Sequence, residues 1–258
     1  MNADINVDGL NYKVVLSNPD DHIQSHLLGG SPYEHGMLQD MAARCAGVVV
    51  DAGANIGNHA VYMAAKGFPV FAFEPDPVLA DCIVESAKLN GLNHLHVAPV
   101  ALGSEPGMGR LVAAPEGNVG AQSVNVKGGD IPILTLDTFD IPASVVKIDV
   151  EGMEMKVLHG AQGTIAQYRP LLYVEAHKGA YKALAEWAKK NGYVHKARFN
   201  STPTYLYVPK EKAGFLRLSI RFGWAGRCLL ICRRWRKSGS RSIPVGITNC
   251  GATTICVG

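Results

Sequence analysis

The sequence predicts an α/β fold with a mostly parallel sheet and helices on both faces. From Val48 onward, apolar runs typical of strands alternate with stretches of helical periodicity, which is the pattern of consecutive βαβ units. The chain has 258 residues, of which 47% are hydrophobic, so it can bury the core of one domain of about 200 residues with appendages. A small-residue bend, D-A-G-A-N-I-G, separates the first such strand from its helix and has the layout of a nucleotide-like ligand loop.

The first 46 residues are expected to form an arm that covers the ligand cleft. Tyr12–Leu16 has the composition of a strand, and Gly29–Pro32 is a turn. Glu34–Ala46 then has apolar residues at helical spacing. The main domain is therefore expected to begin at residue 47.

The main domain is expected to alternate strands and helices. Five strands are expected, at Val48–Asp51, Val70–Glu74, His94–Val100, Val145–Asp149 and Leu171–Glu175. Four helices are expected, at Gly57–Lys66, Pro77–Asn90, Met153–Ala166 and Ala180–Asn191. The pair Asn191-Gly192 suits a left-handed helix cap, and Thr204–Val208 suits a final strand.

Residues 103–135 interrupt this alternation. They are rich in Gly, Pro and β-forming residues, and short strands or a hairpin are expected at Gly109–Ala114 and Val119–Val126. An insertion beyond the carboxyl end of a strand helps to shape a substrate pocket, and an irregular surface loop is the equal alternative.

The bend after the first strand has the form D-x-G-x-N-x-G, from Asp51 to Gly57. Gly53 and Gly57 lack a Cβ atom, so the backbone can turn sharply there and approach a ligand closely. A dinucleotide fingerprint has glycine where this loop has Asn55, so the match to a pyrophosphate-binding loop is poor. Glu74 ends the second strand 21 residues after Gly53, where an acid accepts hydrogen bonds from ribose hydroxyls.

Several further segments follow this loop in a recognisable order. They are F-E-P-D-P at 73–77, A-L-G at 101–103, K-I-D-V-E-G-M-E at 147–154 and V-E-A-H at 174–177. This series, from about Tyr33 to about Val208, resembles the FkbM-type methyltransferase family, and the K-I-D-V-E-G-x-E segment is its most specific element. The resemblance implies a Rossmann-like seven-stranded fold with one antiparallel strand, S-adenosylmethionine as cofactor and, usually, O-methylation of a hydroxyl on a sugar, glycan or secondary metabolite. Residues 47–210 would then be the methyltransferase domain.

The cofactor contacts expected from this resemblance are strand-end and loop residues, namely Asp51, Gly53, Asn55, Gly57, Glu74, Ala101 and Asp149. Ala101 follows the third strand, where the adenine ring would lie. Tyr33-Glu34 matches a Tyr-Glu pair in the family's N-terminal arm, so Glu34 is expected to face the cofactor or the acceptor, with a surface-helix role as the alternative. Lys147 is expected to contact the substrate.

A hydroxyl acceptor is a weak nucleophile near neutral pH, so a general base is expected in the cleft. Asp149 and Glu151 lie at the carboxyl end of the fourth strand, in a charged run that packing alone does not explain. Glu175 and His177 are two residues apart and would face the same side, so His177, oriented by Glu175, is the first choice for the base. Asp149, Glu175 and His177 would also suit a divalent metal, but the sequence does not separate that from a hydrogen-bond network, and no metal is assigned. His59 is expected to be packed.

Residues 211–258 differ in charge from the rest of the chain. They hold nine basic residues and one acid, which leaves residues 1–210 with a net charge of −5. Residues 214–237 combine Trp and Arg side chains and suit a peripheral membrane contact, a phosphate-attracting patch or a docked basic helix. Ser238–Gly258 is expected to be disordered.

The sequence shows no secretory leader, membrane-spanning run or zinc-type cysteine spacing, and the two cysteines before residue 211 suit reduced thiols. We therefore expect a cytoplasmic protein, peripheral at the inner membrane surface if its tail binds lipid. Its partner is expected to be a small-molecule or glycan substrate and not a specific nucleic acid. Two other functions stay open: an oxidoreductase with an NAD-type cofactor, which Asn55 disfavours, and a non-catalytic membrane-associated module that uses the tail.

Overall fold

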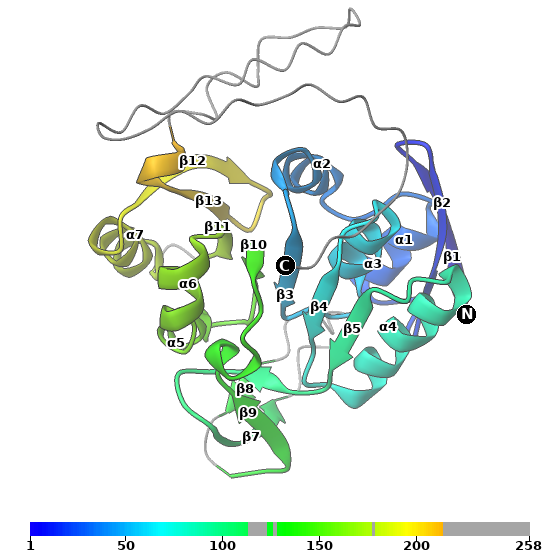
Figure 1. Ribbon diagram of the computed structural model, residues 1–258. Coiled ribbons are helices and arrows are strands. Elements are labelled where there is room, and N and C mark those ends of the chain that lie inside the picture. Colours follow the sequence, from blue (N-terminus) through cyan, green and yellow to red (C-terminus); the bar gives the residue numbers. More distant parts are fainter. Residues whose placement is uncertain (113–122, 126–127, 177–178, 214–258) are drawn as a thin grey trace, which may run out of the picture. The chain divides into compact units, whose positions relative to one another are not determined.

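A computed structural model describes residues 1–112, 123–125, 128–176 and 179–213 of the chain, which are built around a seven-stranded sheet (Figure 1). The strands are β3 (Val48–Ala52), β4 (Val70–Phe73), β5 (Leu95–Ala98), β10 (Ala143–Ile148), β11 (Leu171–Glu175), β12 (Tyr193–Phe199) and β13 (Thr204–Pro209). Their order across the sheet is β12, β13, β11, β10, β3, β4, β5. Neighbours pair in parallel except at β13, which is antiparallel to both β11 and β12. The predicted α/β fold with one antiparallel strand is confirmed.

The central strands are buried on both faces because successive residues point to opposite sides of the sheet. In β3, Val49 packs into a core with the N-terminal elements and two helices, whereas Val50 packs into a second core with three later helices. Figure 1 shows these two sets on opposite sides of the sheet. The helices are α3 (Asn58–Ala65) and α4 (Pro77–Asn90) on one side, and α5 (Glu154–His159), α6 (Gln162–Tyr168) and α7 (Tyr181–Lys190) on the other.

The ends of α4 follow directly from its local sequence. The Asp76 carboxylate accepts a hydrogen bond from the Val78 N–H, which satisfies a free donor at the start of the helix. Pro77 occupies the first helical position, where its missing N–H costs nothing. Gly91 ends the helix in the left-handed conformation, with a φ of 65°. The predicted bounds of this helix are confirmed.

The first 46 residues form a hairpin and two helices, namely β1 (Asn2–Val7), β2 (Leu10–Val15), α1 (His22–Leu28) and α2 (His35–Arg44). The hairpin turns at Asp8 and Gly9, whose φ values of 53° and 74° match a two-residue type I′ turn. Apolar residues of the hairpin and of α2 belong to the same core as α3 and α4. β2 and α2 overlap the predicted elements, whereas β1 and α1 were not predicted.

The insertion after β5 forms a small sheet. Its strands, in spatial order, are β6 (Ala101–Leu102), β9 (Ile131–Leu134), β7 (Gly107–Val112) and β8 (Ser123–Asn125). β7 and β8 pair antiparallel, so the predicted hairpin is confirmed where the chain is described.

One predicted helix is wrong, and one strand of the seven-stranded sheet was not predicted. Met153–Ala166 is not one helix but two, α5 and α6, which are separated at Gly160. A Cβ atom on Gly160 would lie 2.0 Å from the Gly103 carbonyl oxygen, so only glycine fits at this break between the helices. β12 was not predicted; it is an edge strand, and most of its residues are polar or partly exposed.

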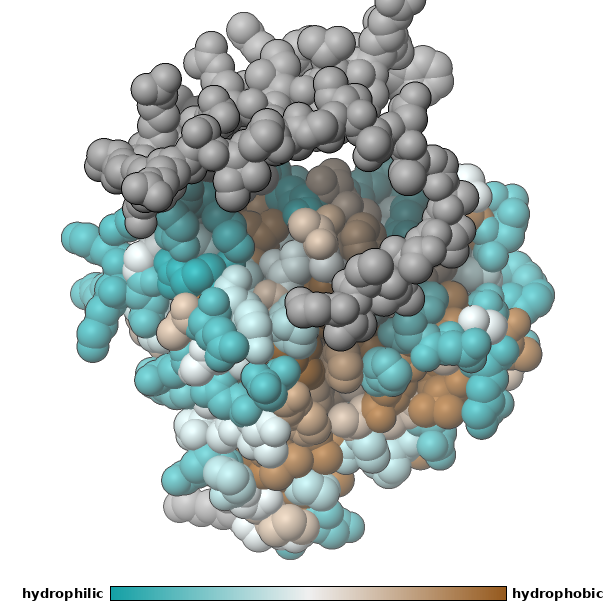
Figure 2. Space-filling model, viewed as in Figure 1, coloured by the Kyte–Doolittle hydropathy of each residue, from teal (hydrophilic) through white to brown (hydrophobic). Residues whose placement is uncertain are grey.

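On the face drawn in Figure 2, apolar residues gather near the centre and polar residues occupy the margins. None of the helices in the described ranges is long and apolar enough to cross a membrane. Residues 214–237 and Ser238–Gly258, for which membrane contact and disorder were predicted, lie outside the described residues, as does His177.

Candidate active site

The candidate site lies where the strand order reverses. β3, β4 and β5 follow one another toward one edge, and β10 returns to pair with the other side of β3. Ligands of open α/β sheets bind beyond the carboxyl ends of strands at such a point. A cleft of about 310 Å³ lies here. Its walls come from the starts of α1 and α3, the turn before α2, the loops after β3, β4 and β10, the carboxyl end of β11, the small sheet and the β12–β13 loop.

The two glycines of the loop after β3 serve the packing of the chain itself. Gly53 has a φ of 76°, and a Cβ atom there would lie 1.7 Å from the carbonyl oxygen of Asp149. The loops after β3 and β10 therefore meet only because Gly53 has no side chain. Gly57 has a φ of 88° and begins α3, where a Cβ atom would lie 3.0 Å from Ile83.

Glu74 is fixed at the end of β4 by backbone donors. Its Oε2 accepts a hydrogen bond of 2.7 Å from the Asn55 N–H, and its Oε1 accepts one of 2.9 Å from the Asp76 N–H. The residue is 6% exposed, and this burial raises the pKa of the Glu74 carboxyl to about 7 even though both N–H groups oppose the shift. Glu74 therefore holds the Asn55 loop against β4 and leaves lone pairs for a ligand in the cleft.

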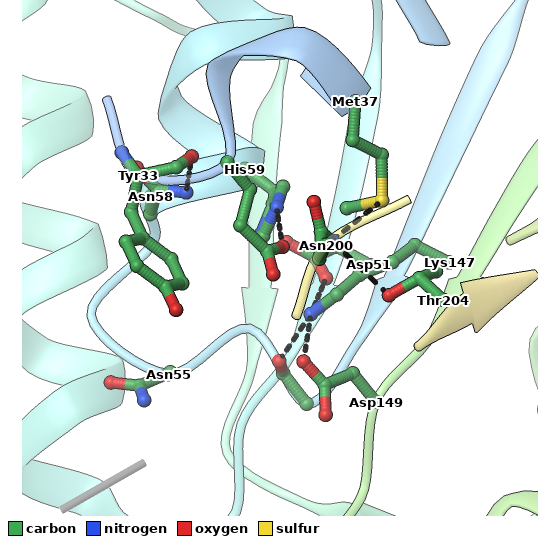
Figure 3. Close-up of polar contacts among 12 residues, drawn as sticks. Tyr33, Met37, Asp51, Asn55, Asn58, His59, Lys147, Asp149, Asn200 and Thr204 are labelled. Carbon is green, nitrogen blue, oxygen red and sulfur yellow. Dashed lines mark hydrogen bonds and ion pairs between the residues drawn. The ribbon is translucent and has the colours of Figure 1, made fainter. Parts of the chain in front are cut away.

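Lys147 joins the ends of β3 and β10 beneath the cleft. Its side chain is 3% exposed, and its ammonium lies 3.1 Å from Asp51 Oδ1 and 3.5 Å from Asp149 Oδ2 (Figure 3). It also donates a 2.9 Å hydrogen bond to the carbonyl oxygen of Gly53. Burial alone would lower the pKa of Lys147, but the charges of Asp51 and Asp149 raise it above its usual value. Lys147 is thus a permanent cation that fixes the loop after β3.

Asp149, Glu151 and Glu175 form an acidic wall of the cleft. Their carboxylate oxygens lie within 4.8 Å of one another. Burial raises the pKa of Glu175 to about 10, with further contributions from its hydrogen bond to Asp149 and from the charges of Asp149 and Glu151. Burial opposes ionisation of Asp149 as well, but the charge of Lys147 holds the pKa of that carboxyl below its usual value. One acid of the contacting pair thus stays ionised, while its partner keeps a proton at neutral pH.

The opposite wall comes from the turn before α2 and from the start of α3. The Asn58 side chain accepts from the Tyr33 N–H and donates to the Tyr33 carbonyl oxygen, each at 2.9 Å (Figure 3). His59 Nε2 lies 3.1 Å from Glu34 Oε2, and both side chains are largely buried. Glu34 precedes α2 but its side chain does not cap that helix, so its carboxylate is available to the cleft.

Three residues that line the cleft have a positive φ. Glu34, Asn55 and Glu151 have φ values of 57°, 51° and 49°, in the left-handed region that side chains rarely adopt. All three line the cleft. Such conformations persist where the surrounding structure holds them, and they are typical of functional sites.

The structure brings most of the predicted site residues together. Those that line the cleft are Glu34, Gly53, Asn55, Glu74, Ala101, Lys147, Asp149, Glu151 and Glu175. Asp51 lies beneath the cleft as the partner of Lys147, and Gly57 begins α3. The insertion contributes Leu111 and Val124, a directly paired couple on β7 and β8.

Sequence reasoning missed several residues of the lining, namely His22, Asn58, His59, Ser201 and Thr202. Their side chains come from helix starts and a turn, which carry no motif. The available signal for Asn58 and His59 was position alone, because they directly follow the glycine loop on the first turn of α3.

The chain is similar in sequence or structure to proteins that are already known, of which two are described here. The hexuronic acid methyltransferase AglP of Haloferax volcanii is 30% identical over 144 residues, which are 51% of this chain and 56% of AglP. The chain therefore matches little more than half the length of that relative. A crystal structure of an FkbM methyltransferase from Methylobacillus flagellatus is 20% identical with a TM-score of 0.48, over 76% of this chain and 48% of that one.

The family comparison covers the site itself. The model of the methyltransferase FkbM domain matches residues 51–195, from the acid that pairs with Lys147 to the first part of β12. This range exceeds half of the chain and contains the loop after β3, Glu74 and the acidic wall. The chain belongs to the FkbM methyltransferase family.

Proposed function

We propose that the protein uses S-adenosylmethionine to methylate a hydroxyl group of a sugar, glycan or secondary metabolite. The observation that carries this proposal is the meeting of three distant motifs at one cleft: the Gly53–Gly57 loop, Glu74 and the Lys147–Glu154 segment. AglP acts on a hexuronic acid, which favours a sugar as the acceptor.

The residues present suit this cofactor. Glu74 presents a carboxylate at the end of β4, where it can accept hydrogen bonds from ribose hydroxyls. The apolar side chains of Leu102, Leu111 and Val124 suit an adenine ring. The acidic wall favours a ligand with a cationic centre and opposes a pyrophosphate, which supports a sulfonium nucleoside over an NAD-type cofactor.

S-Adenosylmethionine would supply a methyl group that its sulfonium activates for displacement. The chain must hold the acceptor oxygen in line with that methyl group, and such alignment lowers a barrier by several kcal/mol, roughly 7 or more in favourable cases. The loop anchored by Lys147 and the strained Glu34 and Glu151 provide fixed walls for this purpose.

The acceptor hydroxyl must also lose a proton to a base in the cleft. Asp149, Glu151 and Glu175 are the carboxyl groups of the described residues at the acidic wall, next to the loop after β3. His177 follows Glu175 by two residues and stays the base predicted from the sequence. Asp149, Glu151 or His177 would act by accepting the proton as the oxygen attacks, whereas Glu175 must first lose its own proton to act in this way.

Calorimetric titration of the protein with S-adenosylhomocysteine tests the cofactor, and titration with NADH is the control. We expect binding of the first and none of the second. Incubation with S-adenosylmethionine and a panel of glycosides then tests the acceptor, because mass spectrometry detects the gain of one methylene unit. A folded sample that does not bind S-adenosylhomocysteine would contradict the proposal.

A further inference from the structure

The N-terminal arm supplies one wall of the cleft through two adjacent contacts with the first turn of α3. Tyr33 and Glu34 are neighbours in the arm, and they meet Asn58 and His59, which are neighbours on the helix. The Asn58 side chain bonds to both backbone groups of Tyr33, and the His59 imidazole lies 3.1 Å from Glu34. All four residues line the cleft. This wall, which we call the arm wall, is therefore fixed by contacts between two segments that are distant in sequence.

The Glu34 carboxylate engages one of its two oxygens within the described part of the chain. Its Oε2 lies 3.1 Å from His59 Nε2, and this nitrogen carries the hydrogen of the bond when the carboxylate is ionised. No other hydrogen bond or ion pair of a described residue reaches the Glu34 side chain, which does not cap α2. The second oxygen, Oε1, can therefore accept a hydrogen bond from a ligand in the cleft.

The Tyr33 ring belongs to the same wall. His22 and His26, which are one turn apart on α1, contact the ring in edge-to-face geometry with centroid distances of 5.6 and 5.5 Å. Figure 3 shows the Tyr33 side chain pointing from the turn before α2 toward the loop that carries Asn55. The residue is half-buried and lines the cleft, so part of its ring is open to a ligand. An aromatic surface and a carboxylate oxygen thus face the cleft from neighbouring positions.

The arm wall comes from a different part of the chain than the residues proposed to bind the cofactor. Those residues follow β3 and β4, whereas Tyr33 and Glu34 lie in the turn before α2. The match to the FkbM domain begins at residue 51, so it contains the loop after β3 and Glu74 but not these two residues. The arm is therefore the part of the cleft that can differ with the acceptor while the cofactor half stays the same.

Resting on the proposed function, we propose that the arm wall binds a saccharide as the acceptor. A sugar ring has apolar C–H faces that stack on an aromatic side chain, and hydroxyls at its edge that donate to a carboxylate. Tyr33 supplies the aromatic surface, and Glu34 Oε1 accepts from the hydroxyls. His59 acts through Glu34: it is a positioning residue that fixes the carboxylate by its Nε2–H. The sugar then lies between the arm wall and the groups proposed to accept its proton.

Saturation-transfer difference NMR on the protein loaded with S-adenosylhomocysteine tests this proposal without any turnover. The probes are the methyl glycosides of D-glucose, D-mannose, D-galactose and D-glucuronic acid. We expect at least one of them to bind. Its C–H protons on one face of the ring should receive most of the saturation, because that face stacks on Tyr33.

Variants of the two contact residues should weaken glycoside binding selectively. Glu34→Gln should weaken it about 10- to 100-fold, the cost of a hydrogen bond to a charged group, and leave the Kd for S-adenosylhomocysteine within about twofold. Tyr33→Leu should weaken glycoside binding roughly three- to tenfold, whereas Tyr33→Phe keeps the ring and should bind as the natural protein does.

Two variants of His59 separate positioning from support of the fold. His59→Gln keeps an N–H donor that can reach Glu34, so it should retain most of the glycoside binding. His59→Ala removes the donor and should lose about as much binding as Glu34→Gln. Tyr181→Leu and Glu186→Gln make matched changes at exposed positions of α7 outside the lining of the cleft, and both should behave as the natural protein does.

A folded, loaded protein that binds none of the four glycosides would overturn the proposal, as would natural binding in both Glu34→Gln and Tyr33→Leu. Equal losses of glycoside and S-adenosylhomocysteine binding would also overturn it, because the arm wall would then contact the cofactor. If a variant of Glu34 or His59 does not fold, Tyr33→Leu and Tyr33→Phe decide. A folded natural protein that does not bind S-adenosylhomocysteine contradicts the proposed function instead, so the two failures are distinguishable.

Discussion

The two halves of the cleft are held by different parts of the fold. In the half proposed to hold the cofactor, which comprises the Gly53–Gly57 loop, Glu74 and Lys147, side chains at the ends of two sheet strands bond to backbone groups: Glu74 accepts from N–H groups, and Lys147 donates to a carbonyl oxygen. In the half proposed to hold the acceptor, which comprises Tyr33, Glu34, Asn58 and His59, the first turn of α3 is joined to the N-terminal arm: the Asn58 side chain bonds to the Tyr33 backbone, and the His59 side chain lies beside that of Glu34. Changes in the first half should therefore disturb folding and cofactor binding, and changes in the second should disturb transfer alone.

Gly53→Ala should have the largest effect. The new Cβ atom would lie 1.7 Å from the Asp149 carbonyl oxygen at a φ of 76°, so two loops must move apart. We expect a loss of about 4 kcal/mol or more in the free energy of unfolding, measured by urea denaturation. Gly36→Ala is the matched control, because no atom lies within 4 Å of its Cβ position in α2, and it should be neutral or stabilising. A loss of less than about 1 kcal/mol for Gly53→Ala would show that the loops after β3 and β10 can move apart easily.

Lys147→Met should cost roughly 3–5 kcal/mol of unfolding free energy, because it leaves Asp51 buried without its cation. Thermal and urea unfolding measure this. Lys156→Met removes an exposed lysine of α5 and should change stability by less than about 0.5 kcal/mol. Similar losses in both variants would contradict a stabilising role for the Lys147–Asp51 ion pair.

Glu74→Gln should weaken S-adenosylhomocysteine binding by about 10- to 100-fold, the cost of losing hydrogen bonds to a charged group. The affinity of the natural protein should also rise as the pH increases through about 7, because the pKa of Glu74 is raised to about 7 and its ionised form is the better acceptor. The variant should lack this part of the pH dependence. Glu85→Gln, exposed on α4, is the control for calorimetry. A pH profile that is the same with and without Glu74 would contradict its contact with ribose.

Glu34→Gln should have the smallest effect on cofactor binding. It therefore gives the clearest contrast between cofactor binding and methyl transfer. We expect the Kd for S-adenosylhomocysteine to stay within about twofold, while methyl transfer to an accepted glycoside falls about 100-fold, the lower end of the range for one positioned acid or base group. Steady-state kinetics and calorimetry on the same preparation measure both. Equal losses in binding and transfer would show that the two halves are not separable.

The sequence predicted the Gly53–Gly57 loop and Glu74 because the residues that define them lie close together in the chain. An apolar run, an acid, small residues and a helix start lie within a dozen positions, and the bounds of β11 and α4 were predicted to the residue. Glu74 and Asp149 follow strands directly, so a parallel sheet brings them to the same edge.

The remainder depends on contacts between segments far apart in sequence. The break between α5 and α6 lies at Gly160, which packs on the carbonyl oxygen of Gly103, and no local helix signal reveals this contact. The partnership of His59 with Glu34 depends on how the N-terminal arm meets α3. Asp51 was assigned to the cofactor, yet its observed partner is Lys147, because burial demands a counter-charge.

The hydrogen bond from Lys147 to the Gly53 carbonyl oxygen should affect both the rate and the affinity of nucleoside binding. The ammonium of Lys147 holds the Gly53 end of the bend from within the protein, so we expect the bend to keep its course when a nucleoside binds. Association then requires little loop ordering, so more of the contact energy appears as affinity.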